Sequence, residues 1–207
     1  MDLLRDPDTD LVDACRHPES EQFESAFEAL YLKYRDRVYS IAYRITGSAV
    51  DAMDVVQESF GLVFRKLDGF RADALFSTWL FRIVVNCSID LRRRERARLL
   101  PGAELDASAE EATDPAIGPA GSAEVHELGA EVHRAIQMLS PKLRVILALR
   151  YLEEMSYDDL ACTLGLSLGT VKSRLARAHL ALERVLRSTF PHLQARDGTS
   201  EGEGALA

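Results

Sequence analysis

The stretch LGLSLGTVKSRLARA, residues Leu164–Ala178, decides the fold of the carboxy-terminal half of the chain. Its Gly-containing turn leads to Ser167, a residue type that commonly caps the start of a helix. On a helical wheel at about 100° per residue, Val171, Leu175 and Ala178 then share one face. This apolar face predicts a helix that packs on a short preceding helix through a tight turn, which is the helix-turn-helix arrangement.

The opposite face of the same helix carries hydrogen-bond donors near its start. Arg can donate two hydrogen bonds to a guanine edge, and hydroxyl groups can reach bases or phosphates. We therefore predict that this helix enters the major groove of DNA, the alternative being an ordinary solvated basic face. The predicted DNA contacts are Ser167, Thr170, Lys172, Ser173, Arg174 and Arg177.

Three further helices are predicted ahead of this one. Apolar residues recur at helical spacing over residues 125–139, and Ser140–Pro141 is a typical start for the next helix. Ser156 is expected to begin the short helix of the helix-turn-helix. We predict a four-helix domain over residues 123–187, followed by a disordered tail over residues 188–207.

The amino-terminal half predicts a bundle of three helices within residues 23–100. From Phe23 to Ile45 the apolar residues are spaced by three and four, and Gly47 is expected to end that helix. Ser48 caps the second helix, and the third is expected to run from Trp79 to about Arg96 after a cap at Ser77 or Thr78. The fold class is therefore all-α, with two small helical domains.

Charge is distributed unevenly over a chain whose formal net charge is -8. Residues 1–22 form an acidic amino-terminal segment, and residues 101–122 are rich in Pro, Gly, Ala, Ser and acids, which predicts a flexible acidic linker. Basic residues concentrate instead at 92–98 and 172–187. Two basic patches on an acidic chain indicate a polyanion that is bound at two defined places.

Several classes of protein are excluded by composition. The apolar runs are too short for an integral membrane segment, and the acidic start is unlike a secretory signal, so we expect a cytoplasmic protein. Cys15, Cys87 and Cys162 lie far apart, without the spacing of a metal or redox pair. We expect reduced thiols and predict no metal site.

Aromatic residues gather beside Arg and Asn in the stretch from Phe70 to Arg98. Such a mixture can stack on unpaired bases while cations hold the phosphate backbone. The alternative is that Trp79 and Phe81 simply belong to the core, which we favour for Phe81.

Three motifs in this order resemble the extracytoplasmic-function sigma factors, the compact promoter-recognition subunits of bacterial RNA polymerase. They are DAMDVVQESF (51–60), FSTWLFRIVVNCSIDLRRR (76–94) and LSPKLRVILALRYLEEMSYDDLACTLGLSLGTVKSRLARA (139–178). The resemblance covers roughly residues 23–186. Met53 departs from the family, which more often has an acid at that place.

The resemblance implies roles for three sets of residues. The second helix is expected to dock on the polymerase core through Asp51, Asp54, Gln57 and Glu58. The start-proximal promoter element is expected to be recognised and melted by Phe70, Arg71, Ser77, Thr78, Trp79, Arg82, Asn86, Arg93 and Arg94. The helix-turn-helix is expected to bind the upstream element through the contacts given above.

The resemblance also implies partners. These are the polymerase core, promoter DNA and a cognate anti-sigma factor, and no cofactor or catalytic residue is implied. The acidic linker is expected either to occupy the nucleic-acid channel of the polymerase or to act only as a solubilising tether, and the sequence leaves both open.

Two other classes of function share features with this sequence. An ordinary helix-turn-helix regulator would act without the polymerase core, but it would need a ligand pocket, phosphoacceptor domain or dimer helix that the first half does not indicate. An enzyme could hold Mg²⁺ with Asp51, Asp54 and Glu58, since clustered carboxylates suit a hard cation. No facing acidic cluster or phosphate-binding loop is evident to complete such a site.

Overall fold

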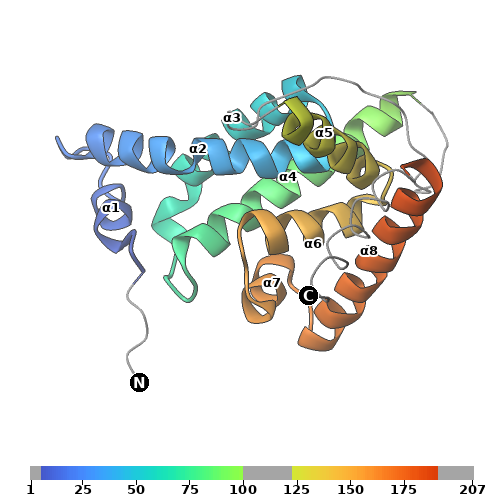
Figure 1. The fold of residues 1–207 in the computed structure, drawn as a ribbon. Coiled ribbons are helices and arrows are strands. Elements are labelled where there is room, and N and C mark those ends of the chain that lie inside the picture. Colours follow the sequence, from blue (N-terminus) through green and yellow to red (C-terminus); the bar gives the residue numbers. More distant parts are fainter. Residues whose placement is uncertain (1–5, 100–122, 191–207) are drawn as a thin grey trace, which may run out of the picture.

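Helices make up all the regular structure in residues 6–99 and 123–190, the parts of the chain that this computed structural model describes. The all-α prediction is confirmed. The predicted linker 101–122 lies outside these ranges. In chain order the elements are α1 (Thr9–Ala14), α2 (Phe23–Thr46), α3 (Ala49–Lys66), the 3-10 turn η1 (Leu67–Gly69), α4 (Phe76–Leu99), α5 (Ala123–Gln137), α6 (Pro141–Leu152), α7 (Tyr157–Leu164) and α8 (Leu168–Thr189), as Figure 1 shows.

Helix α2 is the central helix of the amino-terminal bundle and packs against α1, α3 and α4. Its Val38, Ile41 and Ile45 are completely buried. The helix ends where the sequence predicts, because Gly47 adopts a left-handed φ of 82° and donates its N–H to the Tyr43 carbonyl. A residue with a Cβ would be strained at this φ.

Helix α4 begins three residues before the predicted start. The expected caps were Ser77 or Thr78 with Trp79 as the first helical residue, whereas the helix starts at Phe76. The Phe76 N–H donates to Oδ2 of Asp6 at 2.5 Å, across 70 positions of sequence. The local prediction is wrong because the partner of the helix start comes from a distant segment.

The predicted acidic amino-terminal segment contributes α1 to the bundle. Val12 and Cys15 are each 3% exposed and belong to the core, and burial raises the pKa of the Cys15 thiol to about 11. Asp8 is buried as well, and it accepts hydrogen bonds from the Tyr34 hydroxyl and from Nζ of Lys33, both at 2.5 Å. These contacts make the segment part of the first bundle.

The carboxy-terminal half has the four helices and the helix-turn-helix that the sequence predicts. Ser156 and Asp159 form a reciprocal capping box at the start of α7. Gly165 ends α7 with a left-handed φ of 62°, and the Ser167 hydroxyl accepts from the Thr170 N–H at the start of α8. Local capping chemistry therefore sets the geometry of this turn.

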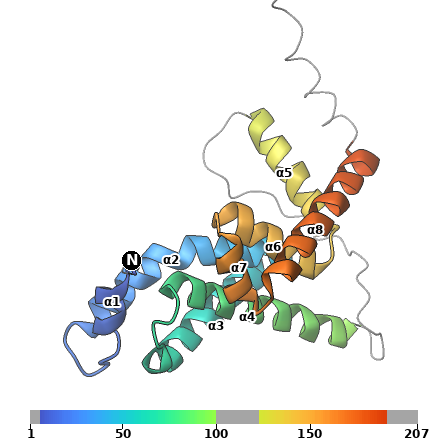
Figure 2. The ribbon, with the colours of Figure 1, turned by 90° about the horizontal axis from the view of Figure 1, so that it is seen from below.

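The two halves pack against each other, with α6 on α2 and α7 on α4 (Figure 2). Arg144 of α6 is only 5% exposed, and it donates to the carbonyls of Leu139 at 2.8 Å and Ile45 at 3.0 Å. Nε2 of Gln137 donates to the Arg44 carbonyl at 2.8 Å. The second half thereby satisfies carbonyls at the end of α2 that have no partner within their own helix.

The carboxy-terminal boundary differs from the prediction. Helix α8 continues to Thr189, two residues into the segment expected to be a disordered tail. Phe190 is 7% exposed, and the guanidinium of Arg134 lies 5.4 Å from its ring centre. A cation–π contact with α5 thus holds the end of α8, and residues 191–207 lie outside the described ranges.

Candidate functional site

Helix α8 presents the predicted DNA contacts at its start. Ser167 and Thr170 hold each other through their hydroxyl oxygens, 2.8 Å apart, while Ser167 caps the helix. Lys172, Ser173 and Arg177 are exposed, and Thr170 and Arg174 are half-buried. The structure therefore brings all six predicted residues together within about the first three turns of the helix.

The other face of α8 fixes the helix in place. Val171, Leu175 and Ala178 are buried, as the wheel predicts, and α8 packs against α5, α6 and α7. A packed helix of this kind presents its polar side chains at defined positions.

A second candidate surface lies along α4. Trp79, Arg82, Asn86 and Arg93 are spaced by three, four and seven residues, which places them on one face of the helix. Arg82, Asn86 and Arg93 are exposed, and Trp79 is half-buried beside Phe70, with ring centres 5.1 Å apart. This face offers one aromatic edge and several donors to a nucleic acid.

Two residues predicted to contact DNA lie in the core instead. Phe70 is 6% exposed and packs edge-on to Phe76, and Thr78 is 3% exposed. Phe70 precedes α4 and packs on Phe76 and Trp79 of its first turn, and Thr78 lies on the face of α4 that turns toward the bundle. Ser77 is half-buried and stays near the surface.

The loop before α4 is exposed and conformationally unusual. The Arg71 side chain is 83% exposed and forms an ion pair with Asp73 at 3.4 Å. Ala72 has a φ of 56°, in the left-handed region that residues with a Cβ rarely adopt. This loop (residues 71–75) lies at the end of α4 that carries Trp79.

The acidic residues of α3 divide between two faces. Asp54 and Gln57 are exposed, whereas Asp51 and Glu58 are half-buried toward α4. Glu58 lies 3.9 Å from Arg94, so this predicted DNA contact points toward α3 rather than along the face that holds Arg82.

Asp51 has a neighbour on α4 that the sequence did not indicate. Burial raises the pKa of Glu95, and the adjacent Asp51 carboxylate raises it further, with Arg92 opposing both. In the part of the chain that the structure describes, no group of three or more His, Cys, Asp or Glu side chains could hold a metal ion. The acids that suggested a Mg²⁺ site therefore do not converge.

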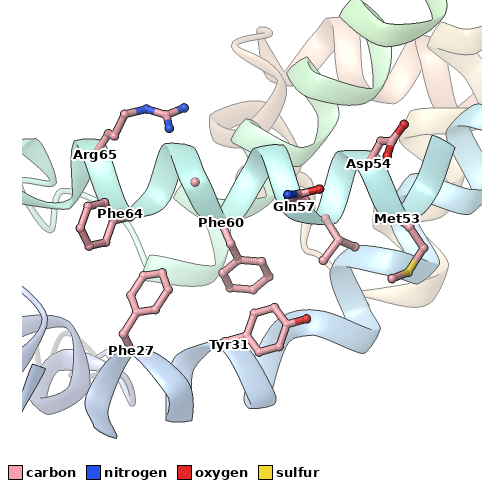
Figure 3. A pocket seen from close by; sticks show the side chains of 10 residues that line it. Phe27, Tyr31, Met53, Asp54, Gln57, Phe60, Phe64 and Arg65 are labelled. Carbon is pink, nitrogen blue, oxygen red and sulfur yellow. The ribbon is translucent and has the colours of Figure 1, made fainter. Parts of the chain in front are cut away.

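An open groove runs between α2 and α3, and we call it the aromatic groove. Figure 3 shows Phe60 and Phe64 of α3 facing Phe27 and Tyr31 of α2, while Asp54 and Arg65 lie along its α3 side. The ring centres of Tyr31 and Phe60 are 4.9 Å apart. The lining residues are Phe27, Tyr31, Met53, Asp54, Val56, Gln57, Phe60, Gly61, Phe64 and Arg65.

The sequence patterns did not predict that these aromatic residues line an open groove. Helical spacing alone places Phe27 and Phe60 on the buried faces of their helices, and it gives no role to Phe64. The available signal was the position of Phe64 and Met53 off the buried stripe of an amphipathic helix, where they are 54% and 58% exposed.

One predicted DNA contact is engaged by the other half of the chain. Nη2 of Arg82 donates to the Cys162 carbonyl on α7 at 2.7 Å. In this arrangement α7 covers part of the α4 surface.

Comparison with known proteins identifies two family regions in the chain. Residues 30–98 match the model "Sigma-70 region 2", and residues 129–182 match "Sigma-70, region 4". The chain belongs to the extracytoplasmic-function sigma factors. The α4 surface and all of the aromatic groove except Phe27 thus fall within region 2 of this sigma factor, and the helix-turn-helix falls within region 4.

Curated relatives match along most of the sigma factor. RNA polymerase sigma-H factor of Pseudomonas aeruginosa is 35% identical over 193 residues, covering 89% of this chain and 96% of the relative. The sigma-E factor of Escherichia coli is 35% identical over 166 residues, covering 77% and 86%, respectively.

Solved structures share the fold of the sigma factor. CnrH in complex with the cytosolic domain of CnrY has a TM-score of 0.64 and 27% identity, covering 88% of this chain and 98% of that one. The sigma factor RpoE of Bartonella quintana, in complex with the anti-sigma factor NepR, has a TM-score of 0.62 and 26% identity, covering 79% and 98%. None of the helices in the described ranges is long and apolar enough to cross a membrane.

Proposed function

We propose that this sigma factor binds the core of bacterial RNA polymerase through the aromatic groove. Met53 and Phe64 are more than half exposed there, although both are large and apolar. Asp54, Gln57 and Arg65 lie beside them. An apolar centre with a polar rim is the usual anatomy of a protein interface.

Two surfaces are assigned to promoter DNA. The start of α8, in the proposed domain 123–187, binds the upstream element in the major groove. The α4 face and the loop 71–75, in the proposed domain 23–100, recognise and open the start-proximal element. Unstacking a base step costs a few kcal/mol, and stacking on an aromatic ring such as Trp79 with backbone contacts from Arg82 returns a comparable amount.

One observation carries the proposal. A single chain combines both sigma regions, and each region presents an exposed surface of hydrogen-bond donors on a helix that is packed in place on its other side. A helix-turn-helix regulator that acts without the polymerase core would not need the α4 surface or the aromatic groove.

The test is run-off transcription on genomic fragments with purified core polymerase. We expect new RNA 5′ ends that require both the sigma factor and the core. A chain that binds promoter DNA alone and creates no start with core would instead be a regulator. Lack of affinity for core, together with no new 5′ ends, would refute the proposal.

An anti-sigma factor is the proposed regulator. The similar proteins CnrH and RpoE were solved with the cytosolic domain of CnrY and with the anti-sigma factor NepR. The proposal assigns no catalytic step to the chain, because the family consists of initiation factors. It places the chain in the cytoplasm, where bacterial polymerase works, and leaves the linker either in the nucleic-acid channel or as a tether.

A further inference from the structure

The exposed loop 71–75 is held at both ends by the amino-terminal segment. Before the loop, Nη2 of Arg16 donates to the Phe70 carbonyl at 2.6 Å. After the loop, the Phe76 N–H donates to Oδ2 of Asp6 at 2.5 Å. Both contacts cross more than 50 positions of sequence, so neither comes from the local fold of the loop.

Asp6 joins the starts of two helices. Its Oδ1 accepts from the Asp8 N–H at 3.0 Å, and its main-chain carbonyl accepts from the Thr9 N–H at 3.0 Å at the start of α1. Its Oδ2 accepts the hydrogen bond from the Phe76 N–H, which is the first N–H of α4. A carboxylate at this place accepts hydrogen bonds from N–H groups that a helix leaves unpaired. Its negative charge also interacts favourably with the positive end of the helix dipole.

The segment that carries Asp6 is itself anchored to α2. Asp8 is 1% exposed and is bonded to Lys33 and to Tyr34, whose ring lies 5.5 Å from that of Phe76. Val12 packs in the core on the same segment. The position of the loop ends is therefore fixed relative to the central helix of the bundle.

The loop needs this support. Ala72 has a φ of 56°, a conformation that a residue with a Cβ keeps only when its surroundings hold it. The loop contains no glycine that would adopt this shape freely. With its two ends released, we expect the loop to relax toward more common conformations.

We propose that the segment Asp6–Arg16 is a positioning element that sets the shape of the loop 71–75, and thereby which base the loop accepts at the start-proximal element. The inference rests on the proposed function and deepens it. Asp6 and Arg16 do not themselves touch DNA. They act on the two ends of the loop.

The test compares promoters within one preparation of holoenzyme. Initiation is measured on a promoter found with the wild-type chain and on a set of copies, each with one base changed in the start-proximal element. For each changed copy we take the ratio of initiation on the original promoter to initiation on that copy. We expect Asp6→Ala and Arg16→Ala to lower this ratio at least fivefold. The ratio is independent of how much of the protein is folded or bound to core.

A second template separates positioning from general damage. On a promoter with a pre-opened bubble, both variants should initiate within twofold of wild type, while opening of the closed duplex slows at least fivefold. Asp6→Asn should restore most of the discrimination, because Asn still accepts a hydrogen bond at a helix start. The matched controls are Glu21→Ala and Arg35→Ala, which remove one exposed charge each outside these contacts.

The outcomes are distinct. Base discrimination within twofold of wild type in both alanine variants would overturn the positioning role, as would equal losses on duplex and bubble templates. Absence of core-dependent initiation by the wild-type chain would overturn the proposed function itself. If Asp6→Ala does not fold, the base discrimination measured with Arg16→Ala decides whether the segment positions the loop.

Discussion

His133 is a half-buried side chain with a predictable effect on pH dependence. Its ring stacks on Tyr43 with centres 4.5 Å apart, and Nδ1 lies 3.4 Å from Nη1 of Arg44. Burial, together with the nearby charges of Arg44 and Arg144, lowers the pKa of His133 to about 4. The folded chain therefore keeps this ring neutral where an unfolded chain would protonate it.

We expect the free energy of unfolding to fall as the pH drops through the window between 6.5 and 4. In that window the unfolded state binds a proton at His133 and the folded state does not, so the slope is at most about 1.4 kcal/mol per pH unit. Above pH 6.5 this residue has no effect. His133→Phe keeps a flat ring on Tyr43. Between pH 6.5 and 5.5, the free energy of unfolding of this variant should fall by about 1 kcal/mol less than that of wild type, as measured by urea denaturation.

A comparison variant tests the assignment. His17→Phe is the comparison variant, because it replaces an imidazole that is exposed on the surface and lies outside the contacts of His133. An unchanged pH profile in His133→Phe would contradict the burial argument.

At the scale of elements, α8 is expected to separate DNA contact from polymerase binding. Arg174→Ala with Arg177→Ala should reduce initiation at promoters that depend on the upstream element by about 10- to 100-fold, since a good bidentate contact to a base contributes about 1–3 kcal/mol. Association with core should stay nearly unchanged. Arg187→Ala, an exposed cation in the last turn of the same helix, is the control. Equal loss of core association in the double variant would count against these roles.

The aromatic groove gives the complementary prediction for α3. Phe64→Ala should weaken binding to core by about tenfold or more, because truncating a central aromatic residue of an interface typically costs over 1 kcal/mol. Val50→Ala removes a side chain that is 72% exposed on the same helix and does not line the groove. Fluorescence anisotropy with labelled sigma factor measures both affinities, and equal affinities for the two variants would exclude the groove as the docking site.

At the scale of the whole molecule, the ion pair of Arg37 and Glu153 connects the two halves. Nε of Arg37 on α2 lies 2.7 Å from Oε2 of Glu153, whose side chain is only 2% exposed at the end of α6. The same guanidinium lies over the rings of Tyr34 and Phe81. Burial raises the pKa of Glu153, and the charge and hydrogen bond of Arg37 oppose the rise.

We expect Arg37→Ala to shift the chain toward separated halves. Removing the cation leaves Glu153 buried without its partner, which is strongly destabilising for the closed arrangement. Small-angle X-ray scattering should show a larger radius of gyration than for wild type. Arg35→Ala is the control, because Arg35 is exposed on the same helix and pairs with the adjacent Asp36. A radius of gyration equal to that of wild type would show that this pair does not hold the halves together.

Local chemistry was sufficient to predict much of this protein from its sequence. The ends of α2 and α7 follow from Gly47 and Gly165, and the start of α8 follows from Ser167, because each signal acts within four residues of the position that it sets. The buried face of α8 follows from helical periodicity in the same way.

Only the tertiary structure decided which residues meet across the chain. The start of α4 depends on Asp6, and Arg144 of α6 bonds the Ile45 carbonyl that the end of α2 leaves open. The aromatic groove depends on how α3 lies on α2. No local pattern contains these contacts, because their partners are brought together by the packing of helices that are far apart in sequence. The sequence motif predicts that Phe70 and Thr78 contact DNA, whereas the packing of the bundle buries both side chains.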